Sequence, residues 1–160
     1  MNVLGIDIGY SNLTRAYGPQ GAEPKVLLRP AGAAPADRLG EKIGGNGEED
    51  FLRVLVNGEP FVAGLSPDRA ELWSRELHED YPSTNSYRAL FHAGLLLSEL
   101  DQIDLVVTGL PVNQYLNPEL RERLAAQMQG EHQITPRRKI TVSKVKVVPQ
   151  PVGGFVDHVW

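Results

Sequence analysis

Hydrophobic and polar residues alternate along the first segment of the chain. The alternation predicts a strand over residues 3–8, with one apolar face and one face that is nearly bare apart from a carboxylate. The apolar face carries Leu4, Ile6 and Ile8, and the other face carries Val3, Gly5 and Asp7. Because Gly5 has no side chain to pack, its place beside Asp7 indicates close approach of a ligand or of another backbone.

The same period of two, interrupted by turn residues, predicts further strands over residues 13–17, 25–29, 51–56 and 60–63. The first three strands of the chain would form an antiparallel meander. Asn57-Gly58 predicts a tight hairpin, because both residues tolerate positive φ. Residues 30–47 are rich in Ala, Gly and Pro and predict a loop, and residues 65–82 predict a short helix with Trp73 and Leu77 as anchors.

Apolar residues recur at helical spacing in two later segments. Residues 85–100 predict a buried helix, in which Gly94 allows close packing. A second helix is predicted from a cap at Asn117 to a stop at Gly130, with Pro118 at its first position. Its buried stripe would consist of Leu120, Leu124 and Met128, and its exposed side would pair Glu119 with Arg123.

Two more strands are predicted in the second half of the chain. Residues 103–108 form an apolar run interrupted by Asp104 and end at the sharp exit 109–112, which is typical of a strand buried on both faces. In α/β proteins, ligands tend to bind at such carboxyl ends. Residues 137–148 also predict a strand, but their alternation changes phase, so we expect a bulge or a break near Ser143-Lys144. Residues 155–160 predict the start of a helix.

Composition limits the class of protein. A length of 160 residues suits one domain, and a formal charge of −4 argues against sequence-independent nucleic-acid binding by that domain. The basic residues 137–139 are therefore interpreted as part of a solvated strand face. The absence of cysteine excludes disulfides and thiolate zinc sites. No apolar run has the length of a membrane span and no secretory signal is recognisable, so a cytoplasmic location is expected.

The four histidines, His78, His92, His132 and His158, are scattered along the chain without the spacing of metal ligands. We expect them to be surface residues, or core residues whose hydrogen bonds are satisfied.

The turn after the first strand carries the candidate chemistry. Gly9 permits a tight reversal, after which Tyr10, Ser11 and Asn12 would present consecutive backbone N–H groups to phosphate oxygens. Asp7 beside this turn could hold a hydrated magnesium ion. The alternative is that Gly-x-Asp-x-Gly is only a hairpin turn. The chain lacks the Gly-x-x-x-x-Gly-Lys-[Ser/Thr], Gly-x-Gly-x-x-Gly and Gly-x-Ser-x-Gly motifs, so a nucleotide would bind by another route.

Three segments carry a family resemblance. Residues 5–12, Gly-Ile-Asp-Ile-Gly-Tyr-Ser-Asn, resemble the first phosphate-binding loop of the actin and sugar-kinase superfamily. Residues 108–115 and 145–152 resemble the bacterial plasmid-segregation actins, the ParM (StbA) family, and the hairpin at 57–58 followed by residues 64–68 fits that group. The resemblance implies an α/β, ribonuclease-H-like domain of the actin-type ATPases, with a mixed sheet and flanking helices. Residues 1–160 would form the N-terminal half of a two-domain clamshell whose second domain is absent from this chain.

The resemblance also implies roles for individual residues. Asp7 would face Mg²⁺ through water, and Gln150 would orient the water that attacks the phosphate. The phosphates would be lined by Gly9, Tyr10, Ser11 and Asn12. One departure stands out: Thr14 occupies a place where family members often carry Lys, so the source of positive charge at the phosphates is open.

By the same resemblance, the full-length protein would hydrolyse ATP, with GTP as the alternative nucleotide, in the presence of Mg²⁺. It would self-associate into filaments and segregate plasmid DNA through a DNA-binding adaptor, without direct contact to nucleic acid or membrane. The domain alone would be inactive. Two alternatives remain: a small-molecule kinase of the same superfamily, and a non-catalytic binding domain that keeps the fold. Gln150 favours hydrolysis, because an amide can position water but is a poor proton acceptor.

Overall fold

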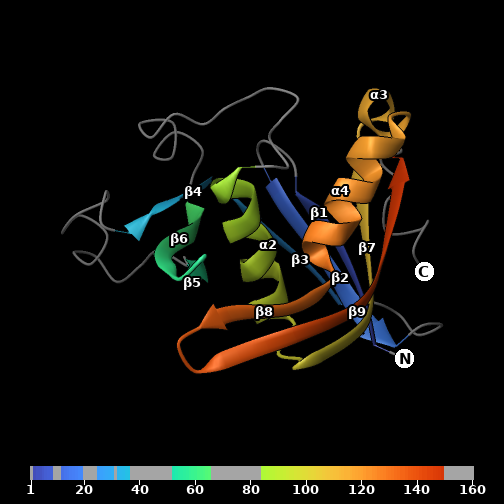
Figure 1. Cartoon of the computed structure of the whole chain (residues 1–160). Coiled ribbons are helices and arrows are strands. Elements are labelled where there is room, and N and C mark those ends of the chain that lie inside the picture. The colour runs from blue at the N-terminus through green and yellow to red at the C-terminus, as the bar shows by residue number, and fades with distance from the viewer. Residues whose placement is uncertain are drawn as a thin grey trace.

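The computed structural model of the protein describes residues 2–8, 12–19, 25–30, 32–36, 52–65 and 84–149. Its centre is a six-stranded sheet in the order β3-β2-β1-β7-β9-β8, accompanied by a three-stranded sheet in the order β4-β6-β5 (Figure 1). The larger sheet consists of β1 (Asn2–Ile8), β2 (Asn12–Pro19), β3 (Lys25–Pro30), β7 (Gln102–Leu110), β8 (Gly130–Thr135) and β9 (Arg138–Pro149). It is a mixed sheet, as expected, because β1, β7 and β9 are parallel whereas the outer pairs are antiparallel.

The first three strands form the predicted meander. Strand β1 pairs antiparallel with β2 from Asn2↔Pro19 to Ile8↔Leu13, and β2 pairs antiparallel with β3. On its other side β1 pairs in parallel with β7. This places β1 in the interior of the sheet, which agrees with its nearly unbroken burial.

The smaller sheet consists of β4 (Gly32–Pro35), β5 (Leu52–Val56) and β6 (Glu59–Leu65). The predicted hairpin between β5 and β6 is confirmed, with positive φ of 52° at Asn57 and 81° at Gly58. The prediction of a loop over residues 30–47 is wrong for residues 32–35, which pair with β6 as an edge strand. The short helix predicted within residues 65–82 and the helix start predicted at residues 155–160 lie outside the described residues, apart from Leu65, which ends β6.

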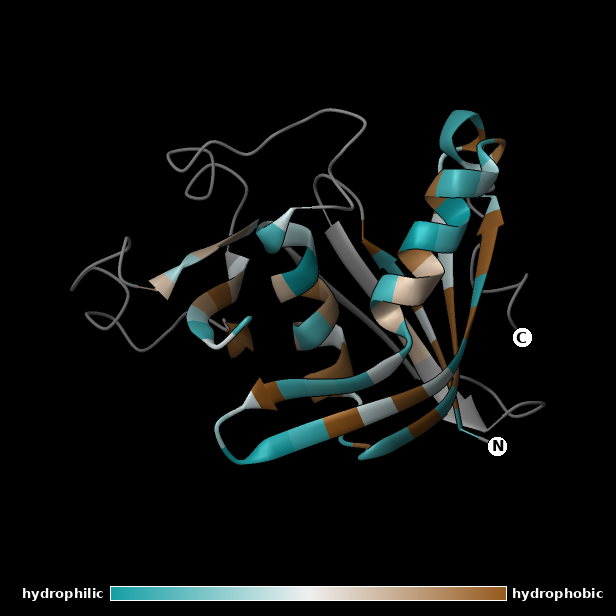
Figure 2. Ribbon diagram, viewed as in Figure 1, coloured by the Kyte–Doolittle hydropathy of each residue, from teal (hydrophilic) through white to brown (hydrophobic). Residues whose placement is uncertain are grey.

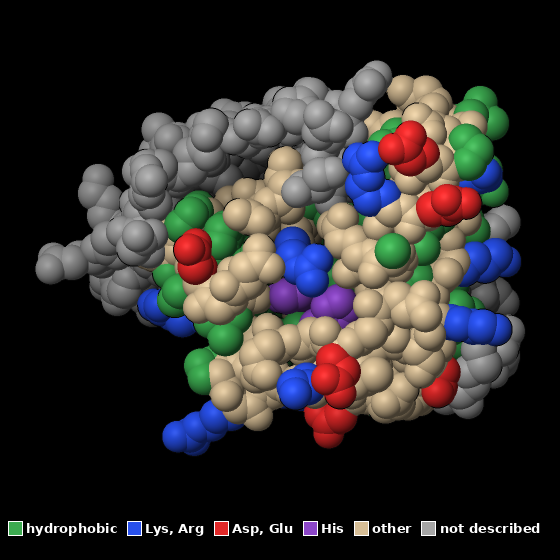
Figure 3. All heavy atoms as spheres, viewed as in Figure 1, with side chains coloured by type: hydrophobic (Ala, Val, Ile, Leu, Met, Phe, Trp, Pro, Cys, Tyr) green, Lys and Arg blue, Asp and Glu red, His purple; other side chains and the backbone are tan. Residues whose placement is uncertain are grey.

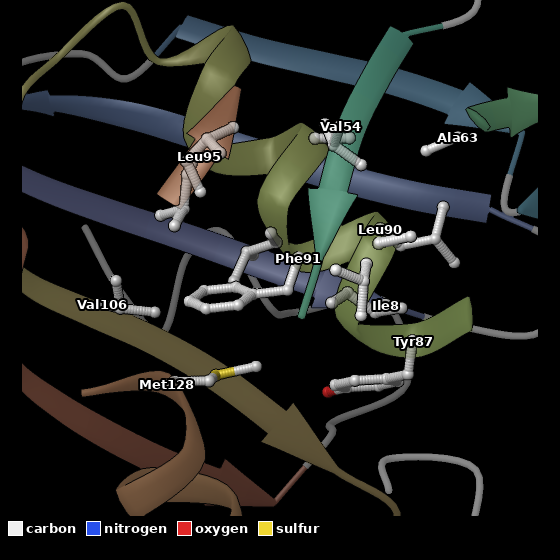
Figure 4. Packing of buried hydrophobic residues seen from close by; sticks show 14 of the residues in the cluster. Ile8, Val54, Ala63, Tyr87, Leu90, Phe91, Leu95, Val106 and Met128 are labelled. Atoms are coloured by element: carbon white, nitrogen blue, oxygen red, sulfur yellow. The ribbon is translucent and has the colours of Figure 1, made fainter. Parts of the chain in front are cut away.

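Helix α2 (Asn85–Leu97) packs on the sheet face that carries Leu4, Ile6 and Ile8. Its first turn is capped by Thr84, whose hydroxyl accepts the Tyr87 backbone N–H at 3.2 Å. The prediction for Gly94 is confirmed, because a Cβ at this position would clash with Cδ1 of Ile6. In Figure 4, side chains from α2, β5, β7 and the last turn of α4 (Pro118–Met128) meet in the main core, among them Phe91, Val54, Val106 and Met128.

Helix α4 has the predicted ends. The side chain of Asn117 accepts the Glu119 backbone N–H at 3.0 Å, Pro118 opens the helix, and Gly130 follows it with φ of 104°. Arg123 and Glu119 form the expected i,i+4 ion pair at 3.1 Å. Of the predicted stripe, Leu124 and Met128 are buried, whereas Leu120 is only partly buried.

Strand β8 and helix α3 (Val112–Tyr115) have no counterpart among the predicted elements. Strand β8 pairs antiparallel with the first half of β9, and its buried residues His132 and Ile134 alternate with exposed Glu131 and Gln133. Figure 2 shows hydrophobic and hydrophilic residues alternating along β9, whereas most of β8 is coloured hydrophilic. Because histidine does not count as apolar in a hydropathy pattern, the alternation of β8 is weak in the sequence.

Strands β7 and β9 change phase at the same level. Before this level, the residues that contact the main core are Ile103 on β7, and Ile140 and Val142 on β9. After it, they are Val106 on β7, and Val145 and Val147 on β9, so odd and even positions exchange faces on both strands. Pairing runs through Ile103↔Val142 and resumes at Leu105↔Lys144 with an unchanged offset, so neither strand has an extra residue. The irregularity expected near Ser143 is therefore a break in pairing and not a bulge.

The remaining expectations for these strands also hold. On β7, Val106 and Val107 are both buried, so this strand is covered on both faces. Four of the five basic side chains of β9 and the preceding turn are exposed, as expected for a solvated face, namely Arg137, Lys139, Lys144 and Lys146. Within the part of the chain that the structure describes, no helix is long and apolar enough to cross a lipid bilayer.

Candidate functional site

The carboxyl ends of three parallel strands meet at one edge of the large sheet. Ile6 of β1 pairs with Thr108 of β7, and Thr108 pairs with Val147 of β9, so these residues form one row across the sheet. Asp7 follows this row on β1. Strand β9 ends at Pro149, paired with Leu110, and Gln150 is the next residue along the chain. The fold therefore brings the ends of the segments that contain Asp7 and Gln150 to the same edge.

Two of the residues nearest to Asp7 on its own face of the sheet are glycines. It is partly buried and has the parity of Val3, so it lies on the face opposite to α2. The residue two places before it on β1 is Gly5, and the residue beside it on β7, next to Thr108, is Gly109. Both glycines are buried and lack a side chain, so no side chain of β1 or β7 lies directly beside the carboxylate.

Of the other predicted site residues, the structure describes some and not others. Asn12 is the first residue of β2, the antiparallel partner of β1, and Thr14 is the Cα partner of Asp7. Residues Gly9, Tyr10 and Ser11, and also Gln150, lie outside the described residues. The two strands that would carry the phosphate loop, β1 and β2, are thus both present and paired.

Thr108 is a polar residue at this edge that sequence reasoning did not single out. It is fully buried, and its Oγ1 has no hydrogen-bond partner. Thr108 lies on the same face of β7 as Val106 and Leu110, so it faces the main core and not the side of Asp7. The hydroxyl of Thr108 therefore does not belong to the candidate site.

The described residues provide one carboxylate for a metal ion at this edge. No group of three or more His, Asp or Glu side chains in the described ranges could hold a metal by itself. A single carboxylate nevertheless fits Mg²⁺, which keeps several waters and takes further oxygen ligands from a bound phosphate. Asp7, beside backbone that is free of side chains, is the described residue that could hold such an ion.

The prediction for the histidines is only partly right. His92 and His132 are buried, and each forms one hydrogen bond to a backbone carbonyl oxygen. The second ring nitrogen of each has no partner, so these core histidines are not satisfied as expected. The residues come from α2 and β8, separated by 40 positions, and no local sequence signal connects them. His78 and His158 lie outside the described residues.

Residues 5–153 match a family described as the N-terminal domain of actin-like proteins. The chain belongs to this family. The match includes the first strand with Asp7, the hairpin at 57–58 and the strand that leads to Gln150. No curated protein sequence matches the chain.

Solved structures of actin-like proteins have the same fold. The archaeal actin homologue Ta0583 superimposes with a TM-score of 0.60 at 19% identity, over 96% of this chain and 47% of that protein. The AlfA filament from the Bacillus subtilis plasmid pLS32 gives 0.59 at 18% identity, over 96% and 58%. ParM of Bacillus thuringiensis in its apo form gives 0.55 at 14% identity, over 95% and 46%.

These matches confirm the expected fold class, an actin-type α/β domain with a mixed sheet and flanking helices. The chain spans about half the length of the solved structures that it resembles. In the described residues, α2 and α4 both contribute to the one main core, so they cover the same face of the large sheet (Figure 1).

Proposed function

We propose that this chain is the N-terminal domain of an actin-like ATPase that polymerises with nucleotide and segregates plasmid DNA. The observation that carries the proposal is the position of Asp7, at the carboxyl edge of the sheet and beside side-chain-free backbone, in a chain of the actin-like family. ATP, or GTP, and Mg²⁺ would bind between this domain and a second domain of similar kind.

The β1–β2 hairpin supplies the phosphate site in this proposal. Asp7 precedes the turn and Asn12 follows it, and Gly9, Tyr10 and Ser11 connect them. Consecutive backbone N–H groups in a turn form a concave site for an anion. Asp7 would hold the water shell of Mg²⁺, which neutralises the charge that develops on the phosphates. Thr14, opposite Asp7, adds no positive charge, so the metal would have the larger share of this task.

Gln150 is proposed to orient the attacking water. Strand β9, which leads to Gln150, is separated from β1 only by β7, so the two strands lie about 10 Å apart across the sheet. That span suits a hydrated metal, a terminal phosphate and a water molecule placed between the two residues. Since hydrolysis at phosphorus depends mainly on positioning and charge stabilisation, an amide is adequate for the role.

The alternatives are less well supported. A kinase needs a second acid as the base toward a substrate hydroxyl. In the last three described residues of β1, β7 and β9, Asp7 is the only acid. A non-catalytic domain would have no need of a carboxylate beside a phosphate turn, so hydrolysis fits the described edge better than either alternative.

Self-association and plasmid segregation follow from the family in this proposal. AlfA, which shares the fold, was solved as a filament of a plasmid-encoded protein. The charge of −4 on this chain favours an adaptor as the component that contacts DNA, because the domain has no excess of basic residues to bind phosphates itself. We place the protein in the cytoplasm, without a membrane partner.

The test uses the full-length protein that contains this domain, with phosphate release and light scattering measured together. Asp7→Ala should lower Mg²⁺-dependent ATP hydrolysis by at least about tenfold, or ~1.4 kcal/mol of transition-state stabilisation, with an unchanged circular dichroism spectrum. Nucleotide-dependent scattering of the wild type indicates filaments. Asp101→Asn is the control, since Asp101 is exposed near the opposite end of β7. Unchanged turnover in Asp7→Ala contradicts the site assignment.

A further inference from the structure

Two buried histidines meet where three elements join. His92 of α2 and His132 of β8 are each only 3% exposed, and their ring centroids are 5.5 Å apart. The rings of Phe91 and His132 are nearly perpendicular, with centroids 5.2 Å apart. Figure 3 shows the two described histidines (purple) side by side at the bottom of a hollow, with a basic side chain next to them. We call this group, His92, His132 and the neighbouring Arg88, the histidine junction.

The hydrogen bonds fix which nitrogen of each ring carries the proton. Nδ1 of His92 lies 2.6 Å from the carbonyl oxygen of Leu55 on β5, and Nε2 of His132 lies 2.6 Å from that of Met128 at the end of α4. A carbonyl oxygen only accepts, so each of these nitrogens donates. In a neutral ring the other nitrogen is therefore a bare acceptor. The junction thus ties α2 to β5, and β8 to α4.

Three polar atoms of the junction have no partner. They are Nε2 of His92, Nδ1 of His132 and Nε of Arg88, all buried. Only one further side-chain atom in the described ranges, Oγ1 of Thr108, is in the same condition. A buried polar group without a partner destabilises the closed arrangement relative to one in which water reaches it. Opening of the junction would therefore be favoured by the hydration of these three atoms.

The charges around the rings have one sign. The positive charge of Arg88 lowers the pKa of both imidazoles. Protonation of either imidazole would place a second cation beside Arg88. Charged residues on the elements around the rings are exposed: Arg53 on β5, Glu122 on α4, and Glu131 on β8, which pairs with Lys139 of β9 at 3.7 Å. Among the described residues, no carboxylate acts electrostatically on either ring. A proton taken up in the closed junction would thus be uncompensated.

We propose that the histidine junction is a proton-controlled joint, closed while both imidazoles are neutral, whose protonation releases β8 from α2 and β5. Strand β8 pairs with the first half of β9, with His132 opposite Ile140. Strand β9 continues past its break in pairing with β7 to Pro149 at the candidate site. Once released from α2 and β5, β8 would be held by its pairing with β9, which would open more readily, so the joint is a device by which acidification loosens the strand that leads to Gln150.

The direction of the effect follows from the pKa values. Burial lowers the pKa of His92 from 6.5 to about 4, against the Leu55 hydrogen bond, and His132 and Arg88 lower it further. Burial also lowers the pKa of His132, against its bond to Met128. A group whose pKa is lower in the closed state binds its proton after opening. The joint is therefore fully closed above pH ~6.5 and opens as the pH falls toward 4.

Hydrogen exchange of the β8 amides tests the proposal on the protein as it stands. After correction for the intrinsic exchange rate, the opening constant of residues 130–135 should rise about tenfold per pH unit between pH ~6 and ~4.5 for each proton taken up. Residues 2–8 of β1, in the interior of the sheet, are the internal reference. An equal rise in both segments would indicate global acid unfolding and would overturn the proposal.

A matched variant separates the rings from other acid-sensitive groups. His92→Asn with His132→Gln keeps an N–H near each carbonyl oxygen but cannot take up a proton, so the pH dependence of β8 opening should vanish. Glu131→Gln, which removes an exposed acid from the same strand, should retain it. If the double variant does not fold, the proposal is tested on the wild type by following the NMR signals of the two imidazole rings as the pH is lowered. Titration of both rings near pH 6.5, without a change in β8 exchange, overturns the joint.

Discussion

The hydroxyl of Thr108 is buried in the centre of the large sheet without a hydrogen-bond partner. Valine has nearly the same shape and replaces the hydroxyl by a methyl group. Because the unpaired hydroxyl costs roughly 1–3 kcal/mol when buried, Thr108→Val should raise the free energy of unfolding by about 1 kcal/mol. Urea denaturation measures the change, and an unchanged slope would show that the unfolding transition is otherwise the same.

Thr84 is the matched control for this substitution. Its hydroxyl accepts the backbone N–H of Tyr87 and caps α2. Thr84→Val removes the acceptor, so it should lower the free energy of unfolding by about 1 kcal/mol. The same chemical change is thus expected to have opposite signs at two positions. Destabilisation by both substitutions would mean that the Thr108 hydroxyl has a partner.

At the scale of elements, the contact between α2 and β1 depends on one glycine. A Cβ at Gly94 would clash with Cδ1 of Ile6, and both residues are buried. Alanine favours a helix by about 1 kcal/mol over glycine, but overpacking costs roughly 1–3 kcal/mol, so Gly94→Ala should destabilise the protein or at best be neutral. Thermal unfolding of the purified variant measures the difference.

The double variant Gly94→Ala with Ile6→Val identifies the cause. Valine lacks the Cδ1 that clashes, so the second substitution should offset much of the first. By itself, Ile6→Val should cost about 1 kcal/mol, because it removes a buried methyl group. A double-mutant cycle then gives a favourable coupling energy. If the two effects simply add, α2 does not owe its position to this contact.

The elements that could be predicted from the sequence are those with local signals at their ends. Helix α4 has Asn117, Pro118 and Gly130 at the places that end a helix, and the β5–β6 hairpin has Asn57-Gly58. Strand β4 lacks such signals: its residues Gly-Ala-Ala-Pro have no β-branched side chain, and only pairing with β6 makes them a strand. Strand β8 depends likewise on the burial of His132 by residues distant in sequence.

At the scale of the whole molecule, the candidate site could be predicted only in part. The alternation of residues 3–8 was sufficient to place Asp7 at the end of a strand, on the face opposite to Ile6. The alternation was not sufficient to predict the order of the strands, because the parallel pairing of β1 with β7 joins residues about 100 positions apart. The same holds for the histidine junction, since contacts between distant segments arise from packing and leave no local period in the sequence.

The domain arrangement proposed for the family has a consequence for this chain in isolation. If nucleotide is held between two domains, each supplies roughly half of the contact free energy. For a full-length affinity near 1 μM, or about −8 kcal/mol, half corresponds to about −4 kcal/mol and a Kd of ~1 mM. We therefore expect the 160-residue chain to bind Mg·ATP weakly by calorimetry, with binding reduced further by Asp7→Asn and unchanged by Asp101→Asn. A micromolar Kd for the isolated chain would contradict the two-domain site, because one domain would then hold the whole nucleotide.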